Sequence, residues 1–248
     1  MKAMILAAGL GTRLRPLTDD RPKALVEIAG RTMLEITLGR LFSFGVREVI
    51  VNAHHFADRI VEYLKAHGDF GMRIEVSRED VLLDTGGGLK NAAPFFLEDE
   101  GPDEPFILHN VDVLSSIDLG KMARVHGERG ALATLAVQRR ETSRYLLFDE
   151  QLQLCGRRAG REGAPELVRS APRVEALAFC GIHMISSRFL RRMTEEGIFS
   201  ILTPYLRLAA QGETIVGYRA DDYYWRDLGK PEQVSQAEQD LNNKVVQQ

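Results

Sequence analysis

Residues 2–25, KAMILAAGLGTRLRPLTDDRPKAL, join a short apolar run to a glycine-containing loop that is crowded with positive charge. The run over 2–6 predicts a buried strand, and Gly9 and Gly11 follow soon after it. Glycines let the backbone approach a ligand closely and turn its N–H groups inward, an arrangement that suits phosphate oxygens. Because open α/β sheets bind ligands at the carboxyl ends of their strands, this stretch predicts a ligand-binding loop of that class of fold.

Strand-like and helix-like segments alternate through the first half of the chain. Helical spacing of apolar residues over 32–45, 56–68 and 117–130 alternates with strand-like runs over 47–53, 72–77 and 105–113, and 87–96 predicts a short helix. Asp118 is the expected N-cap of the helix that it precedes. This order predicts a parallel sheet with helices on both faces.

The second half has a different pattern. Runs over 131–139, 144–150, 151–157 and 175–186 predict closely spaced strands, and helices follow over 187–197 and 201–212. Late strands are expected over 214–220 and 223–229, and Pro231 is a favoured first residue for a final helix. The segment 156–172 is rich in Arg, Gly and Pro and predicts an exposed loop. We therefore expect one α/β domain over 1–248, with a single mixed sheet that is mostly parallel in its N-terminal half.

Composition limits the classes of partner. The 248 residues carry a net charge of -3 and are 44% hydrophobic, so the chain as a whole offers no basic surface for nucleic acid. The apolar run near the N-terminus is too short for a signal peptide or a membrane span. Cys155 and Cys180 form no CxxC pair, which argues against a zinc site and favours a reducing compartment. We expect a cytoplasmic protein that binds neither nucleic acid nor membrane, and we allow for a homo-oligomer.

Three kinds of phosphate loop compete for the opening stretch. A dinucleotide GxGxxG loop would need a glycine where Leu14 stands, and a Walker A loop would need the GK[ST] that is missing here. A triphosphate loop that adds side-chain cations fits better, because Arg13 offers a bidentate fork and Lys23 a point charge. A solvated surface loop with no ligand is the remaining reading.

At this point the sequence resembles the sugar nucleotidyltransferases. The opening stretch matches their signature, approximately GxGTRLxPLTxxxPKxL, almost throughout. Residues 82–92 resemble the family's segment near the nucleobase, and 106–114 resemble the strand that ends in a metal-binding aspartate. Residues 179–186 resemble the sugar-site strand, and 223–233 the late segment with a second metal-binding aspartate. The resemblance implies a Rossmann-like mixed α/β sheet of the GT-A type.

The resemblance also implies a reaction and the residues that carry it. An oxygen of a sugar 1-phosphate attacks the α-phosphorus of a nucleoside triphosphate, and pyrophosphate leaves as the nucleotide sugar forms. Arg13, Lys23 and Asp112 are the implied catalytic residues, and Asp112 and Asp227 are the implied ligands of Mg²⁺. The acceptor sugar 1-phosphate is expected at Asp112, Gly181 and Asp227. The nucleotide is expected at Leu6, Ala7, Ala8, Gly9, Gly11, Thr12, Arg13, Lys23, Thr85, Gly86 and Gly87.

Several positions depart from the family pattern. Val111 replaces a usual glycine beside Asp112, and Lys230 replaces a usual threonine. The lysine that contacts the sugar phosphate in many members has no counterpart, and Arg157 or Arg158 could substitute for it.

Three readings of the activity remain open at this stage. The segments most resemble the branch with uridylyltransferases of N-acetylmuramic acid 1-phosphate, so UTP is the expected nucleotide. One alternative is a guanylyltransferase that uses GTP and mannose or heptose 1-phosphate. Another is a catalytically inactive paralogue that binds nucleotide sugars. A glycosyltransferase would need a DxD motif, which is absent around Asp112.

Overall fold

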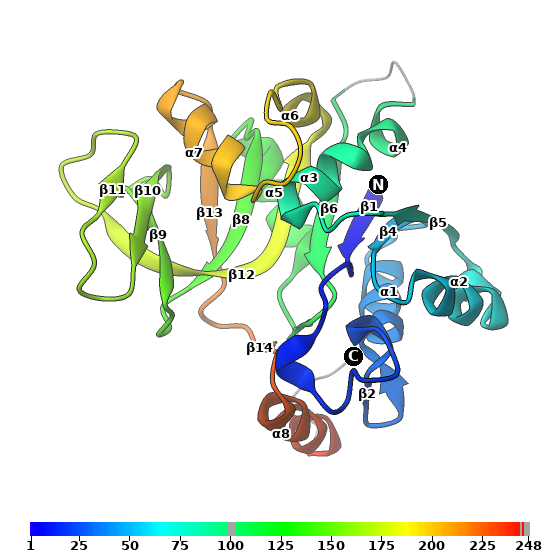
Figure 1. Ribbon diagram of the computed structural model, residues 1–248. Coiled ribbons are helices and arrows are strands. Elements are labelled where there is room, and N and C mark those ends of the chain that lie inside the picture. The colour runs from blue at the N-terminus through cyan, green and yellow to red at the C-terminus, as the bar shows by residue number, and fades with distance from the viewer. Residues whose placement is uncertain (99–102, 244, 246–248) are drawn as a thin grey trace.

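A computed structural model describes residues 1–98, 103–243 and 245, and its elements are shown in Figure 1. The strands are β1 Lys2–Leu6, β2 Glu27–Ile28, β3 Arg31–Thr32, β4 Glu48–Ala53, β5 Arg73–Arg78, β6 Pro105–Asn110, β7 Val113–Ser115, β8 Ala133–Gln138, β9 Arg144–Phe148, β10 Leu154–Ala159, β11 Glu166–Leu167, β12 Glu175–Ser186, β13 Ile215–Arg219 and β14 Trp225–Asp227. The α-helices are α1 Met33–Ser43, α2 Ala57–Ala66, α3 Asp84–Asn91, α4 Ala93–Leu97, α5 Leu119–Glu128, α6 Ser187–Arg191, α7 Leu202–Ala210 and α8 Pro231–Asn242. Short 3₁₀ turns cover Thr12–Leu14, Lys23–Leu25 and Gly68–Gly71.

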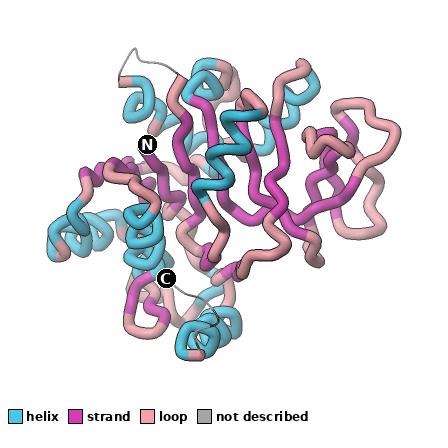
Figure 2. The backbone as a smooth tube through the Cα atoms, turned by 180° about the vertical axis from the view of Figure 1, so that it is seen from behind, coloured by secondary structure: helices cyan, strands magenta, loops and turns pink. Residues whose placement is uncertain are grey.

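Strands from both halves of the chain join in one central sheet. Over the described residues it has ten strands, with the order β11-β10-β9-β12-β6-β1-β4-β5, and β8 and β13 branch from β12. The pairs β1–β4, β1–β6 and β4–β5 are parallel, whereas β12 runs antiparallel to β6, β8 and β9. Figure 2 shows these strands through the middle of the molecule from behind. The mixed α/β sheet, mostly parallel in its N-terminal half, is confirmed.

Successive side chains of β1 are buried on opposite faces of the sheet, which explains why helices cover both faces. Successive side chains of a strand point to opposite faces. Ala3 and Ile5 belong to the core cluster that also holds side chains of α1, α2 and α8, while Met4 belongs to the cluster with α3, α4, α6 and α7. All three side chains are fully buried. The apolar run at the N-terminus is therefore a two-sided core strand, as parallel sheets require.

The segment 156–172 is not the loop that its composition predicts. β10 continues to Ala159, and β11 returns antiparallel to it with Gly156 opposite Leu167. Within the turn, Gly160 adopts a positive φ of 60°, a conformation that glycine takes without strain. The expectation was wrong because arginines at exposed strand positions hide the apolar alternation that marks a strand.

The strand expected over 105–113 is in fact two strands. β6 ends at Asn110, and β7 leaves the central sheet to pair antiparallel with β14 in a separate two-stranded sheet. Val111 and Asp112 form the turn between them. This break places Asp112 at the carboxyl edge of the central sheet rather than inside a strand.

Two helices differ from their expected bounds. α6 ends at Arg191, well before the expected end at 197, and α3 begins at Asp84 and carries its three glycines inside the helix. The expected N-cap of α5 is confirmed, because the side chain of Asp118 accepts a hydrogen bond from Lys121 N at 2.8 Å. Among the described residues, no helix is long and apolar enough to cross a membrane.

Candidate active site

Two pockets meet at the turn that follows β6. The first, here called the β1 pocket, has a volume of about 410 Å³ and lies at the ends of β1, β4 and β6 beside α3. The second, here called the hairpin pocket, has a volume of about 550 Å³ and lies against β9, β10, β12 and β14. Asn110 and Asp112 line both pockets, so the two spaces share a boundary.

An ion pair stands at that boundary. The ammonium of Lys23 binds the carboxylate of Asp112, and the two side chains are only 12% and 18% exposed. Lys23 begins the 3₁₀ turn after the opening loop, 89 positions before Asp112 in the sequence. The structure therefore brings together two of the three predicted catalytic residues.

Asp227 reaches the same place from the late strand. β14 pairs with β7 so that Asp227 lies opposite Val113, and Leu228 N donates to the carbonyl of Asp112 at 2.8 Å. Asp227 Oδ1 accepts from Gly229 N at 2.7 Å. Both aspartates line the hairpin pocket, so the two predicted metal ligands lie at one site.

The donor set at this site suits magnesium bound together with a substrate. No group of three or more His, Cys, Asp or Glu side chains that could hold a metal occurs in the described part of the chain. Two carboxylates alone do not form a closed cage, but Mg²⁺ typically takes one or two carboxylates and completes its shell with phosphate oxygens and water. Asp112 already holds a cation in the form of the Lys23 ammonium. The residues present therefore fit a magnesium ion that arrives with phosphates.

Arg13 lies on the far side of Asp227. It lines a separate hollow of about 340 Å³ together with Arg140, Asp227 and Lys230. A Cβ atom at Gly229 would stand 2.7 Å from Asp227 Oδ1 and 2.8 Å from Arg13 Nη2, so both groups flank this glycine. Arg13 is thus near Asp227 and does not line the β1 pocket.

A chain of buried hydrogen bonds, here called the Asn52–Glu79 relay, holds the backbone that lines the β1 pocket at the end of β1. Asn52 Oδ1 accepts from Ala7 N at 2.7 Å, and Asn52 Nδ2 donates to Glu79 Oε1 at 2.6 Å. Glu79 Oε2 accepts from Leu83 N at 3.0 Å. Asn52 and Glu79 are 2% and 5% exposed, so these bonds fix the backbone where β1 ends. Sequence reasoning missed both residues, although polar residues at the ends of β4 and β5 fall at the same edge of a parallel sheet.

The predicted nucleotide-binding residues divide into two groups. Leu6, Ala7, Ala8, Gly9, Lys23 and Thr85 line the β1 pocket. Gly11 and Thr12 lie outside that lining, and Gly11 instead makes a turn with a φ of 66° whose carbonyl accepts from Thr18 Oγ1 at 2.9 Å.

Gly86 and Gly87 make packing contacts in the structure. A Cβ at Gly86 would stand 2.5 Å from the ring of Phe199, and one at Gly87 would stand 2.5 Å from the carbonyl of Gly197. Their N–H groups both donate to the carbonyl of Phe199, at 2.9 and 3.2 Å. These glycines let α3 lie against the segment before α7, and they do not line the β1 pocket.

Gly181, which the sequence predicts at the acceptor, lines the hairpin pocket. Its φ is 73°, and a Cβ there would stand 2.9 Å from Asn110 Nδ2. Arg157 and Arg158 both line this pocket, and they occupy opposite faces of β10 because Arg157 pairs with Leu146 and Arg158 with Tyr145. The contact of either arginine with an acceptor stays a prediction.

The hairpin pocket is also lined by an arginine and a tryptophan that sequence reasoning missed. The guanidinium of Arg140 lies over the ring of Trp225 with its carbon 3.7 Å from the ring centroid, and Arg140 Nη2 donates to Phe179 O at 2.6 Å. Trp225 Nε1 donates to Cys180 O at 2.7 Å. Burial lowers the pKa of the Arg140 guanidinium. The two residues are far apart in the sequence, so no local pattern marks them as a pair.

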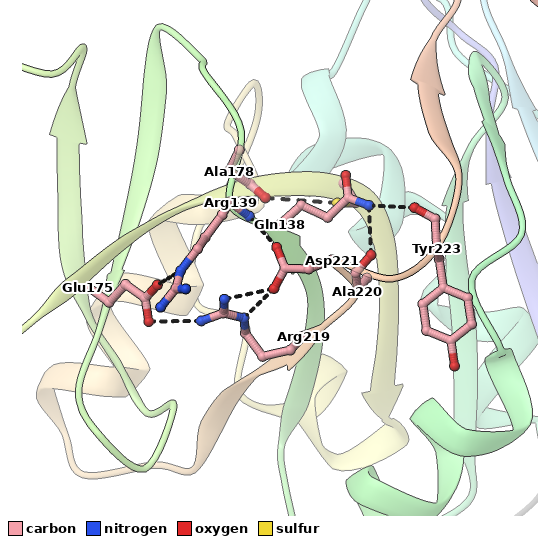
Figure 3. Close-up of polar contacts among 9 residues, drawn as sticks. Gln138, Arg139, Glu175, Ala178, Arg219, Ala220, Asp221 and Tyr223 are labelled. Carbon is pink, nitrogen blue, oxygen red and sulfur yellow. Dashed lines mark hydrogen bonds and ion pairs between the residues drawn. The ribbon is translucent and has the colours of Figure 1, made fainter.

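A polar network holds the segments that carry Arg140 and Trp225 (Figure 3). Gln138 Nε2 donates to Ala220 O at 2.7 Å and to Tyr223 O at 2.9 Å, which ties β8 to the turn before β14. The ion pairs of this network join Arg139 to Glu175, Glu175 to Arg219 and Arg219 to Asp221. These contacts therefore fix the turn that leads to Asp227.

Comparison with known proteins gives matches over most of the chain. The sequence model described as "Nucleotidyl transferase" matches residues 2–148. The N-acetylmuramate alpha-1-phosphate uridylyltransferase of Caulobacter vibrioides is 35% identical over 241 residues, which cover 93% of this chain and 92% of that protein. The mannose-1-phosphate guanyltransferase of Aspergillus fumigatus is 36% identical over 147 residues, 58% of this chain but only 40% of that longer protein.

Solved structures agree on the fold. A putative glucose-1-phosphate thymidylyltransferase from Bacillus anthracis superposes with a TM-score of 0.79 at 15% identity, covering 100% of this chain and 97% of that one. At that identity the likeness shows the fold alone. The family match over 2–148 and the relative that this chain matches nearly end to end show that the chain belongs to the nucleotidyl transferase family, as an enzyme of the sugar 1-phosphate nucleotidyltransferase type.

Proposed function

We propose that this enzyme transfers a uridylyl group from UTP to N-acetylmuramate α-1-phosphate, forming UDP-N-acetylmuramate and pyrophosphate. The observation that carries the proposal is the junction of two pockets at the Lys23–Asp112 ion pair, because a two-substrate transfer needs two adjoining spaces and charge at their boundary. The choice of substrates is supported by the Caulobacter vibrioides relative, which this chain matches over 93% of its length.

The β1 pocket is the proposed nucleotide site. Its wall at Ala7, Ala8 and Gly9 is made of small residues, so a flat base can approach the backbone closely. The Asn52–Glu79 relay keeps that wall in place. Lys23 then meets the phosphates at the end of the pocket nearest Asp112.

The hairpin pocket is the proposed acceptor site. In the reaction, a phosphate oxygen of the acceptor forms a bond to the α-phosphorus of UTP, and the bond from that phosphorus to the bridging oxygen of the β-phosphate breaks. Lys23 holds a positive charge where negative charge would gather on the α-phosphate, and Arg13, which lies beside Asp227, would pair with the departing pyrophosphate. Asp112 and Asp227 would hold Mg²⁺, which neutralises phosphate charge when it is bound.

A second candidate is guanylyl transfer from GTP to mannose 1-phosphate. It is favoured by the 36% identity to the Aspergillus fumigatus guanyltransferase over 147 residues. The nucleotide side of the site would then take a purine in the same β1 pocket.

A pyrophosphate-release assay separates the candidates. The purified chain is tested with each of the four nucleoside triphosphates and Mg²⁺ against N-acetylmuramate, N-acetylglucosamine, glucose and mannose 1-phosphates. The proposal expects the highest kcat/KM for UTP with N-acetylmuramate 1-phosphate. A higher value for GTP with mannose 1-phosphate would support the second candidate instead.

A further inference from the structure

The hairpin pocket holds more positive charge than one sugar phosphate requires. Four arginines line it, Arg140, Arg144, Arg157 and Arg158, against the three carboxylates of Asp112, Glu166 and Asp227. The two aspartates belong to the centre where the phosphates meet, so only Glu166 balances charge along β9 and β10. A neutral sugar ring would gain little from such a surface.

Strand register places two of these arginines on one wall. Arg144 and Leu146 are two positions apart in β9, so their side chains share a face. Arg157 lies opposite Leu146 in the β9–β10 pairing, and Glu166 lies opposite Arg157 in the β10–β11 pairing. Leu146 packs in the core cluster that includes Leu202 of α7, so this wall faces α7.

This wall lies at a distance from the reacting phosphates. β9 pairs with Glu175–Ala178 of β12, whereas β6 pairs with Ile182–Ser186 of the same strand. The wall is therefore separated from Asp112 along β12 as well as across the sheet. Figure 1 shows the β9–β10–β11 hairpin at the margin of the molecule, away from β1. Within this pocket, an acceptor with its phosphate at Asp112 would reach Arg144 and Arg157 only with the far side of its sugar ring.

The charges on this wall are only partly satisfied. Arg157 Nε donates to Glu166 Oε2 at 2.7 Å, and Glu166 is itself 64% exposed. Arg144 is exposed, and within the described residues it makes no ion pair with an acidic side chain. Glu166 thus occupies a place that another carboxylate could take beside Arg157, while Arg144 is available to pair with the same group.

We infer that the outer end of the hairpin pocket is a carboxylate subsite, in which Arg144 and Arg157 bind an acid group carried by the acceptor sugar. The lactyl group of N-acetylmuramate supplies such a carboxylate, so this inference rests on the proposed function and deepens it. Arginine suits the role because its planar fork binds a carboxylate through two parallel hydrogen bonds. Glu166 acts as the exchangeable partner that leaves Arg157 when the acceptor binds.

The test compares two acceptors that differ in charge and hardly in shape. N-acetylmuramate α-1-phosphate and its lactyl methyl ester are assayed with UTP, and the ester is measured as a competitive inhibitor if it is not turned over. We expect the wild-type enzyme to prefer the acid about tenfold or more, the range for a charge-assisted contact. The double variant Arg144→Met/Arg157→Met should bring that ratio close to one, and Glu166→Gln should raise it.

Arg161→Met is the matched control. Arg161 is an exposed arginine that also pairs with a glutamate, Glu141, but it does not line the hairpin pocket. Its variant should keep the wild-type ratio. A wild-type ratio near one, or an unchanged ratio in the double variant, would overturn the subsite while leaving uridylyl transfer intact. Absence of any turnover of the acid by the wild type would instead reject the proposed function.

Discussion

Lys23 is the residue on which the site depends most, because it joins the opening loop to the turn after β6. Its side chain is largely buried against Asp112, although the loop around it is mostly exposed. Replacing Lys23 by Met should lower kcat about a hundredfold or more, since a charge that acts on the transition state is lost. The unpaired Asp112 should also lower the free energy of unfolding by about 1 kcal/mol.

The measurement is steady-state kinetics together with urea unfolding of the same protein. Lys65→Met is the control, because Lys65 is an exposed lysine on α2 away from both pockets. It should leave both quantities unchanged. Near-normal turnover in Lys23→Met would show that the ion pair with Asp112 is structural only.

Asp227 tests the metal assignment at the same scale. Asp227→Asn removes one of the two carboxylates that line the hairpin pocket beside Asp112, and a neutral amide is a weaker ligand for a hard cation. We expect the Mg²⁺ concentration for half-maximal rate to rise about tenfold or more, with kcat reduced. Asp222→Asn, at an exposed position five residues earlier, should give the wild-type magnesium curve. An unchanged magnesium requirement in Asp227→Asn would remove this residue from the proposed metal site.

At the scale of elements, glycines let α3 pack closely against the segment before α7. Gly86→Ala would put a methyl group 2.5 Å from the Phe199 ring and 2.9 Å from the Phe199 carbonyl. We expect the free energy of unfolding to fall by about 1–3 kcal/mol, as in other overpacked sites. Gly127→Ala in α5 is the matched comparison, because its added Cβ meets nothing within 4 Å. That change should stabilise the protein by about 0.5–1 kcal/mol in the same denaturant titration. Equal effects at both positions would contradict the packing role of Gly86.

The elements also show which parts of the fold can be predicted from the sequence. β1, α1, β4 and α2 follow from their own apolar periodicity, because each element buries one or both faces on its own. The two-stranded sheet of β7 and β14 does not, since its partners lie more than a hundred residues apart and each strand has only three residues. The sequence predicts the start of β10 but neither its end nor β11, because arginines at exposed positions of β10 and the two-residue length of β11 hide the pattern of a strand.

The candidate site divides in the same way. The opening loop and the two aspartates carry a signature that one sequence can show. Asn52, Glu79 and Arg140 carry none, because their importance comes from contacts between distant elements. Gly86 and Gly87 show a related limit, since the sequence alone does not separate a glycine required for packing from one required for a ligand. Their contact with the nucleotide stays a prediction.

For the whole molecule, buried histidines set the response to acid. Burial lowers the pKa of His126 to about 4 and that of His183 to about 3, from an ordinary value of 6.5. The folded state keeps these rings neutral, whereas the unfolded state binds protons below pH 6.5. Their contribution to stability is therefore complete above about pH 6.5 and is lost as the pH falls toward the folded values.

Urea unfolding at pH 7 and pH 5 should show this loss. Each ring should contribute about 2 kcal/mol to the decrease in the free energy of unfolding over that interval. His126→Asn should be less stable at pH 7, because Thr134 and Ser186 lose their partner, but should show a smaller decrease between the two pH values. His55→Asn, at an exposed position, should keep the wild-type decrease. A decrease that is the same in all three proteins would show that His126 does not titrate on unfolding.

The central claim is that two pockets meeting at Lys23 and Asp112 hold the two halves of the product. The most direct measurement is a crystal structure of the enzyme with UDP-N-acetylmuramate and Mg²⁺. The account predicts the uracil in the β1 pocket against Ala7 and Gly9, the pyrophosphate beside Lys23 and Asp112, and the sugar in the hairpin pocket with its carboxylate at Arg157. A nucleotide sugar bound with its base in the hairpin pocket, or away from Asp112 altogether, would contradict it.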